Sequence, residues 1–165
     1  IEGSEAAHVV NAWQVLQGEV NIGGRVVIAD WRCDWVGLGL AEKLARNGCN
    51  VRLAVNGMIA GQTIPQYARD TWLENLHKLG VEIISHVRLF GVDTEDAYFQ
   101  HTLSGQPVVL STVDTLVTVL GHSSNTELEK SLSSNDISYH VIGGSLSPRT
   151  VEEAILEGLS IAVKL

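Results

Sequence analysis

Charged and aromatic residues fill the loop that follows the first apolar run of the sequence. Residues 25–30 (RVVIAD) form that run, and residues 30–39 (DWRCDWVGLG) follow it. A loop between a strand and a helix is where parallel-sheet proteins bind the pyrophosphate of a dinucleotide. The chemistry to consider here is therefore nucleotide binding, with Asp30 and Arg32 as candidate contacts.

The glycines of this loop differ from those of a pyrophosphate-binding turn. Such a turn needs glycines in its first half so that the backbone can approach the phosphates. Here Gly37 and Gly39 come late and suit tight packing of a helix against a strand. In addition, the carboxylates of Asp30 and Asp34 would each repel a diphosphate by about 1 kcal/mol even when solvated.

Two tryptophans leave the loop with two possible roles. Trp31 and Trp35 could act with Arg32 to hold a ligand, for example by stacking on an adenine ring. Alternatively, the tryptophan side chains plug a pocket that binds nothing. We favour the second role, because bulky residues in place of glycine fill the space that a cofactor needs.

The end of the next strand-like run, residues 51–55, gives an independent criterion. A dinucleotide site usually has an acid there for the ribose hydroxyls, or a basic residue for a 2′-phosphate. This sequence has Asn56, which could donate a hydrogen bond but carries no discriminating charge. Both markers of an NAD(P) site therefore fail together.

The other reactive side chains show no motif of a metal or nucleophilic site. The six histidines are scattered and do not pair with a cysteine at ligand spacing. Cys33 and Cys49 form no CxxC pair, so both are interpreted as reduced thiols. Ser145 follows two glycines but lacks the context of a nucleophile elbow. The acidic residues at 93–96 are expected at a solvated hairpin tip.

Composition bounds the class of protein. The chain has 165 residues, of which 45% are hydrophobic and 18% charged, which is ample for a packed core. A net charge of −8 without a Lys/Arg cluster argues against nucleic acid and anionic membrane surfaces as partners. No apolar run reaches the length of a membrane span, and no signal peptide is evident. From the interpretation of Cys33 and Cys49 as reduced thiols, we expect a cytoplasmic protein. Because the sequence begins at Ile1, we expect it to be cut from a longer chain.

The order of apolar runs predicts an α/β fold. The pattern is strand–helix–strand–helix–strand with short connections, typical of a Rossmann-like doubly wound parallel sheet. A helix precedes this pattern, with Val9, Trp13 and Leu16 on one stripe. The predicted elements are a helix at 6–17, strands at 25–30, 51–55 and 81–84, and helices at 38–47 and 65–79.

The second half of the chain has a different pattern of predicted elements. Three short strands at 86–92, 97–103 and 107–110 predict an antiparallel β-meander. A buried strand at 115–120, a helix at 127–132, a strand at 138–142 and a helix at 150–163 are predicted to follow. The last helix has an apolar face, formed by Val151, Ile155, Leu159 and Ala162, so we expect self-association into a homo-oligomer.

This order of elements resembles the pyridine-nucleotide domain of flavoproteins with two dinucleotide-binding domains. Residues 8–16 (HVVNAWQVL) resemble the linker after the first FAD-binding half in one branch, the old-yellow-enzyme-like oxidoreductases with an iron–sulfur cluster. That branch includes 2,4-dienoyl-CoA reductase and trimethylamine dehydrogenase. Residues 30–42 (DWRCDWVGLGLAE) resemble most its N-methylproline demethylase-like members. Residues 141–155 (VIGGSLSPRTVEEAI) resemble its closing FAD-contact segment.

The resemblance implies two domains and a set of cofactor contacts. Residues 1–122 would be an NAD(P)-binding-like Rossmann domain with an N-terminal linker helix, and 123–165 the C-terminal strand–helix part of an FAD-type domain. The implied contacts are Gly121, at the end of the first part, and Gly143, Gly144, Ser145 and Arg149 in the second part. The family's aspartate for the FAD ribityl chain is Gly144 here, so contact through residues 143–145 could only be made by backbone.

The resemblance also implies cofactors and partners in a larger parent enzyme. FAD or ADP/NAD(P) would bind in the parent, with FMN and an iron–sulfur cluster held outside this chain. The partners would be the TIM barrel and the first FAD half, and the parent would oxidise an amine or reduce an enoyl-type substrate. We expect no tightly bound nucleotide, no catalytic residue and no activity in this chain alone. Two alternatives stay open: a stand-alone binding or docking module, and an atypical NAD(P)- or ADP-binding domain that uses Arg32 and Asn56.

Overall fold

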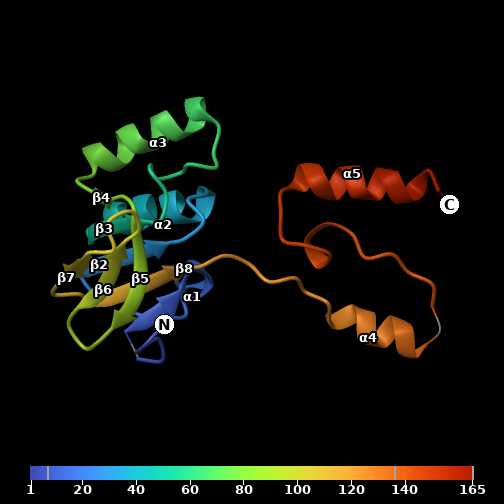
Figure 1. Ribbon diagram of the computed structural model, residues 1–165, viewed down its shortest axis with the longest axis horizontal. Coiled ribbons are helices and arrows are strands. Elements are labelled where there is room, and N and C mark those ends of the chain that lie inside the picture. The colour runs from blue at the N-terminus through green and yellow to red at the C-terminus, as the bar shows by residue number, and fades with distance from the viewer. Residues whose placement is uncertain (7, 136, 165) are drawn as a thin grey trace. The chain divides into compact units, whose positions relative to one another are not determined.

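The computed structural model describes residues 1–6, 8–135 and 137–164. The chain divides into two compact units, Ile1–Leu120 (unit 1) and Gly121–Leu165 (unit 2). Figure 1 shows the elements of each unit, which are considered separately below.

Unit 1 is built on a five-stranded parallel sheet with the strand order β1-β8-β2-β3-β4. Its strands are β1 (Val9–Asn11), β2 (Arg25–Asp30), β3 (Asn50–Val55), β4 (Glu82–Ile84) and β8 (Thr115–Val119). The central strand β2 pairs with β3 on one side and β8 on the other. Its register places Asp30 between Val55 and Val119 at the carboxyl end of the sheet.

Three helices of unit 1 pack on one face of this sheet: α1 (Ala12–Gln17), α2 (Trp35–Arg46) and α3 (Gln66–Lys78). Side chains alternate along β2, so that Val26 and Ile28 belong to the core beneath these helices. Asp30 lies two residues after Ile28, so its side chain is on the same face of the strand and faces the helices. The residues of α2 that enter this core include Leu38, Ala41 and Leu44 at helical spacing.

An antiparallel three-stranded sheet covers the opposite face. It consists of β5 (Val87–Val92), β6 (Ala97–His101) and β7 (Pro107–Leu110), in that order. Val27 and Ala29 of β2 pack against it, in a second core that includes Phe99 (Figure 1). Because both faces of β2 are buried, its sequence is almost uninterruptedly apolar. The predicted fold class, a Rossmann-like parallel sheet with an antiparallel meander, is confirmed.

Unit 2 contains α4 (Glu127–Ser134), the 3₁₀ turn η1 (Gly143–Ser145) and α5 (Val151–Ala162). Thr150 begins α5 with a capping box, since Glu153 accepts hydrogen bonds from the backbone and hydroxyl of Thr150. Of the described residues in unit 2, Gly143 alone is buried. Unit 2 therefore has helices but very little core of its own.

The predicted N-terminal helix at 6–17 is wrong in its first half. Val9 lies in β1, paired with β8, and the helix begins only at Ala12. Asn11 sets this boundary, because its side chain accepts hydrogen bonds from the backbone N–H groups of Trp13 and Gln14. Trp13 is half-exposed, so the predicted apolar stripe is also wrong. Ala7 lies outside the described residues.

Other elements also differ from the prediction. Residues 138–142 form no strand, because a strand needs a paired neighbour and the described part of unit 2 contains none. Helix α2 starts at Trp35, three residues earlier than predicted, because Asp34 caps it. The helix predicted at 127–132 extends to Ser134.

The core beneath the helices should dominate the stability of unit 1. Leu53 is fully buried in β3, so Leu53→Ala should lower the free energy of unfolding by about 2–5 kcal/mol. Leu103 is 74% exposed, so Leu103→Ala is a matched control with an expected change below about 0.5 kcal/mol. Urea denaturation followed by circular dichroism measures both, and equal losses in the two variants would contradict this assignment of the core.

Candidate functional site

The carboxyl end of β2 holds a buried carboxylate, that of Asp30. Only 2% of Asp30 is exposed, because Val55 and Val119 flank it in the sheet. Its Oδ1 accepts hydrogen bonds from the backbone N–H groups of Arg32 (3.1 Å) and Cys33 (2.9 Å). Its Oδ2 is buried and has no hydrogen-bond partner among the described residues. Burial raises the pKa of Asp30 to about 6, against the opposing effect of the hydrogen bond from Cys33.

The unpartnered oxygen of Asp30 faces the first turn of α2. A Cβ atom at Gly37 would lie 2.1 Å from Asp30 Oδ2, so this glycine is needed to accommodate the carboxylate. Gly39 is different, because a Cβ atom there would meet nothing within 4 Å. The expectation of tight packing at both glycines is therefore correct for Gly37 and wrong for Gly39.

Asp34 and Arg32 complete the turn into α2. Asp34 is the N-cap residue, and its Oδ1 accepts a hydrogen bond from the backbone N–H of Val36 at 3.0 Å. Its Oδ2 lies 3.1 Å from Nε of Arg32. Arg32 thus pairs with a carboxylate of its own loop, which partly neutralises the cation that was predicted to contact a ligand.

The tryptophans do not plug the site, so that prediction is wrong. Trp31 is 44% exposed and Trp35 is 51% exposed. The ring of Trp35 lies beside Trp72 of α3, with centroids 5.3 Å apart. Trp72 in turn donates a hydrogen bond from Nε1 to Glu42 of α2 at 2.7 Å. Trp35 therefore helps to join α2 to α3 at the surface.

Cys33 links the loop after β2 to the loop after β3. Its backbone is in the left-handed region, with φ 53°, and its side chain is buried. Sγ accepts a hydrogen bond from the N–H of Gly57 at 3.3 Å, and the carbonyl accepts from the N–H and hydroxyl of Thr63. Burial raises the pKa of the Cys33 thiol, so the thiol stays neutral and is a poor nucleophile. The structure contains Cys33 as a free thiol.

The predicted contact Asn56 lies beside Asp30, but through its backbone. The N–H of Asn56 donates to the carbonyl of Asp30 at 3.1 Å, which continues the pairing of β3 with β2. Asp30, Arg32, Gly37 and Asn56 are therefore brought together at one edge of the sheet. Sequence reasoning missed Cys33 and Thr63, whose roles depend on contacts between two loops.

Little space remains at this edge on the meander side of the sheet. A pocket bordered by Ala29, Asp30, Trp31 and Leu120 has a volume of about 10 Å³. That is about the space of one water molecule. Pockets that bind small molecules are typically about 300–1,000 Å³, so this one is far too small for a nucleotide.

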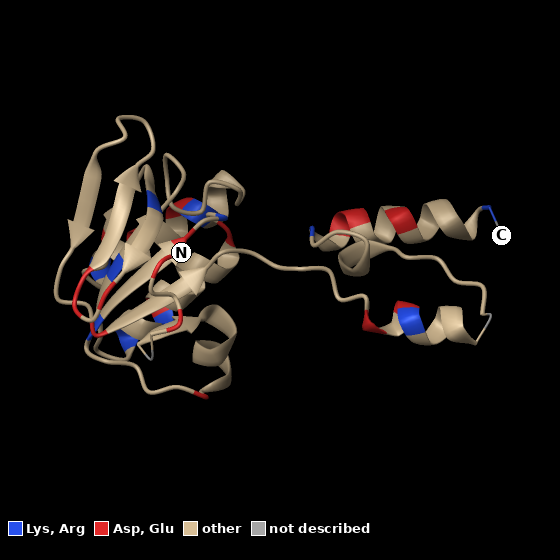
Figure 2. Cartoon of the chain, turned by 60° about the horizontal axis from the view of Figure 1, so that its bottom comes forward, with Lys and Arg blue, Asp and Glu red and all other residues tan. Residues whose placement is uncertain are grey.

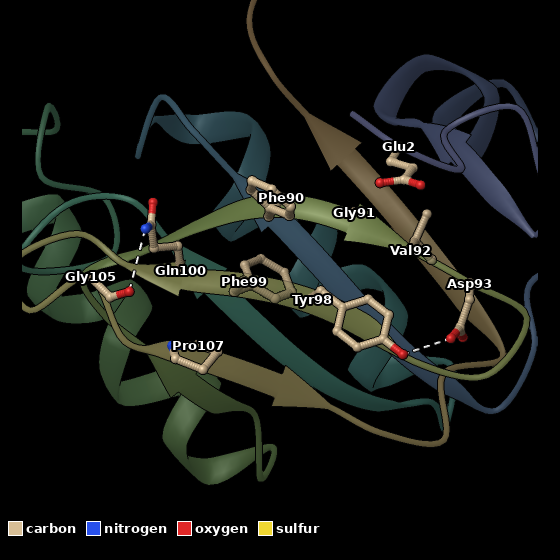
Figure 3. Close-up of a pocket in the computed structure, with 10 residues that line it drawn as sticks. All are labelled: Glu2, Phe90, Gly91, Val92, Asp93, Tyr98, Phe99, Gln100, Gly105 and Pro107. Carbon is tan, nitrogen blue, oxygen red and sulfur yellow. Dashed lines mark hydrogen bonds between the residues drawn. The ribbon is translucent and has the colours of Figure 1, made fainter.

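A larger pocket of about 500 Å³ lies against the meander (Figure 3). Phe90 stands on the bulge of β5 and is largely exposed, and Tyr98 and Pro107 extend the apolar wall. Two polar side chains of this pocket bond within it: the Tyr98 hydroxyl donates to Asp93 at 2.7 Å, and Nε2 of Gln100 donates to the carbonyl of Gly105 at 3.4 Å. It therefore offers an apolar surface without convergent polar groups, unlike a typical catalytic site.

Two of the site residues predicted in unit 2, Gly143 and Arg149, contact Glu157, which sequence reasoning missed. The N–H of Gly143 donates to Glu157 Oε2 at 2.7 Å, and Arg149 pairs with Oε1 of the same carboxylate. Gly143 has φ 61° and faces Ala154 of α5, so a side chain there would be strained. Gly144 and Ser145 complete the turn η1, and Gly121 opens unit 2 at φ 116°.

Charged residues are spread over the chain and do not gather by sign. In Figure 2, Lys and Arg are interspersed with Asp and Glu among uncharged residues. Within residues 1–6, 8–135 and 137–164, no group of three or more His, Cys, Asp or Glu residues could hold a metal ion. Among these same residues, no helix has both the length and the apolar character needed to cross a membrane.

The chain is similar to known oxidoreductases in part of its sequence and in its fold. No protein-family profile matches the chain. The N,N-dimethylglycine/sarcosine dehydrogenase of Chromohalobacter salexigens is 32% identical over 76 residues, covering 43% of this chain and 11% of that protein. Histamine dehydrogenase from Rhizobium sp. 4-9 superposes on 98% of this chain with a TM-score of 0.86 and 18% identity. The 6-hydroxypseudooxynicotine amine oxidase of Pseudomonas geniculata N1 superposes on 97% with a TM-score of 0.87 and 22% identity.

The resemblance inferred from the sequence is confirmed. The chain is similar to the dimethylglycine/sarcosine dehydrogenase in the sequence of one stretch, and to the histamine dehydrogenase and the amine oxidase in the fold of nearly its whole length. It spans 26% and 25% of the two solved structures, which is about a quarter of the length of each. At these identities the solved structures establish the fold alone.

Burial of Asp30 predicts a distinctive pH dependence of stability. Because its folded-state pKa is raised, the folded state binds the proton more tightly than the unfolded state does. The free energy of unfolding should therefore fall by about 3 kcal/mol in total as pH rises from below the unfolded pKa, near 3.8, to above the folded pKa, about 6. Asp30→Asn should remove this contribution, while Asp70→Asn, at an exposed position on α3, should not. Urea denaturation at several pH values measures the free energy of unfolding as a function of pH. If this free energy varied with pH in the same way in wild type and Asp30→Asn, the burial of an ionisable carboxylate would be contradicted.

Proposed function

We propose that this chain is the C-terminal nucleotide-binding-like part of a flavin-dependent oxidoreductase, and that unit 1 is a structural domain without an NAD(P) site. One observation carries this proposal. Unit 1 has the fold of a nucleotide-binding domain, yet three backbone N–H groups at its strand–helix loop, those of Arg32, Cys33 and Val36, are bonded to the chain's own aspartates.

The residues at the carboxyl edge do not fit a dinucleotide. The pyrophosphate of such a ligand needs free N–H groups and close backbone approach at the helix N-terminus. Here Asp30 and Asp34 accept those hydrogen bonds, and Arg32 pairs with Asp34. Asn56 offers no charge to a ribose or a 2′-phosphate. The atypical NAD(P)-binding role for Arg32 and Asn56 is therefore disfavoured.

Unit 2 has the character of an incomplete domain. Four apolar side chains of α5 (Val151, Ile155, Leu156 and Leu159) are each 60–74% exposed, which a stable isolated domain would avoid. We propose that unit 2 is the C-terminal part of an FAD-type domain, with its missing half supplied by the parent enzyme.

The remaining cofactor chemistry belongs to the parent enzyme. FAD or ADP in the parent would meet unit 2 near the turn Gly143–Ser145, where the N–H of Gly143 is already bonded to Glu157. Gly144 provides no carboxylate, so these residues would contribute backbone contacts only. FMN and an iron–sulfur cluster, which supply electron transfer when bound, would lie outside this chain with the TIM barrel. The parent would act on an amine or an enoyl-type substrate.

Nucleotide titration tests the proposed loss of the NAD(P) site. Calorimetry of the full chain with NADH, NADPH and ADP should show no saturable heat, because Asp30 and Asp34 accept the hydrogen bonds of the Arg32, Cys33 and Val36 N–H groups. The chain should also fail to reduce dyes with NADH or NADPH. Saturable binding of any of these nucleotides in the micromolar range would overturn the proposal for unit 1.

Association state tests the proposed role of unit 2. In the absence of the parent's other half, α5 should drive self-association through its exposed apolar face. Sedimentation velocity should show oligomers for the wild type and a shift to monomers for Ile155→Glu/Leu159→Glu. Ser160→Glu, at an exposed polar position of the same helix, should leave the oligomers intact. A wild type that stays monomeric at high concentration would contradict the role assigned to α5.

A further inference from the structure

We infer that Asp30 is the residue that closes unit 1 to nucleotide phosphates, by holding its own carboxylate where this fold would otherwise bind a ligand anion. The inference rests on the proposed function, in which unit 1 binds no dinucleotide. It adds the identity of the group responsible.

The first argument concerns hydrogen-bond donors. In the loop between β2 and α2, the N–H groups of Arg32 and Cys33 both donate to Asp30 Oδ1. In the first turn of α2, the N–H of Val36 donates to Asp34. These are backbone donors of the kind that hold a phosphate in a dinucleotide-binding turn. A phosphate could use them only after displacing an internal carboxylate.

The second argument concerns the unpartnered oxygen. Asp30 Oδ2 is buried without a hydrogen-bond partner and lies against the first turn of α2, at Gly37. The N-terminus of this 12-residue helix carries partial positive charge, which favours an anion there. The Asp30 carboxylate is thus placed as a bound anion would be, and Gly37 provides the room.

The third argument concerns the tryptophans, which could block the turn in place of Asp30. Trp31 and Trp35 are about half exposed, so their rings do not fill the buried turn between β2 and α2. Asp30, in contrast, is fixed in the central strand between Val55 and Val119 and cannot swing into solvent. Removal of the Asp30 carboxylate, and not removal of the indole rings, should therefore open the turn.

A gain-of-binding experiment tests this inference with the full chain. Asp30→Gly removes both carboxylate oxygens and frees the two loop N–H groups, so pyrophosphate and ADP should bind at least about tenfold more tightly than to wild type. Asp30→Asn removes the charge but keeps an acceptor oxygen for both N–H groups, so it should gain less than Asp30→Gly. Trp31→Ala/Trp35→Ala should gain nothing.

Control variants separate local from general effects. Glu95→Gln removes one negative charge at an exposed position in the hairpin tip, away from the β2–α2 loop, and should bind as weakly as wild type. Circular dichroism should show native secondary structure in each variant. If Asp30→Gly does not fold, Asp30→Ala provides the same test, since it also lacks both oxygens.

The outcomes separate the inference from the proposed function. If wild type itself binds ADP saturably, the proposed function of unit 1 fails. Suppose that wild type shows no binding of ADP and that the folded Asp30→Gly or Asp30→Ala variant binds it no more tightly than wild type or Glu95→Gln does. The inference about Asp30 is then overturned, while the proposed function stands. A gain confined to the tryptophan double variant would also overturn it.

Discussion

A single carboxylate organises the place where this fold would bind its ligand. Asp30 turns its Oδ1 back to the N–H groups of Arg32 and Cys33 while Oδ2 lies against Gly37. These contacts fix the loop between β2 and α2, and Cys33 then holds the loop after β3. Burying a carboxylate with one unpartnered oxygen costs stability at neutral pH. The parallel sheet, packed on both faces, tolerates that cost.

The two units differ in how far they bury their apolar residues. Unit 1 buries both faces of its central strand, one beneath helices and one beneath the meander. Unit 2 buries almost nothing and presents the apolar face of α5. This contrast is the basis of our proposal that unit 2 is part of a larger domain. The chain spans about a quarter of the length of the two solved structures it resembles.

The sequence predicts most of the fold because buried parallel strands have a strong apolar signature. Residues 25–30 and 115–120 illustrate this, whereas residues 138–142 have strand composition but no neighbour to pair with. Val9 has helical spacing with Trp13, yet long-range pairing with β8 makes it a strand residue. The site was harder to predict: the sequence indicates that Asp30 opposes phosphate, but not that it accepts the loop's own hydrogen bonds. That role depends on the register of β2 and on the room at Gly37, which only the packed structure provides.

The backbone amide resonances of Arg32, Cys33 and Val36 give the most direct test of this account. In a heteronuclear NMR titration of the wild-type chain with ADP, these three N–H groups should not shift, because Asp30 and Asp34 already occupy them. A saturable shift of all three, in step with ADP concentration, would show that the turn accepts a ligand phosphate and would contradict the account.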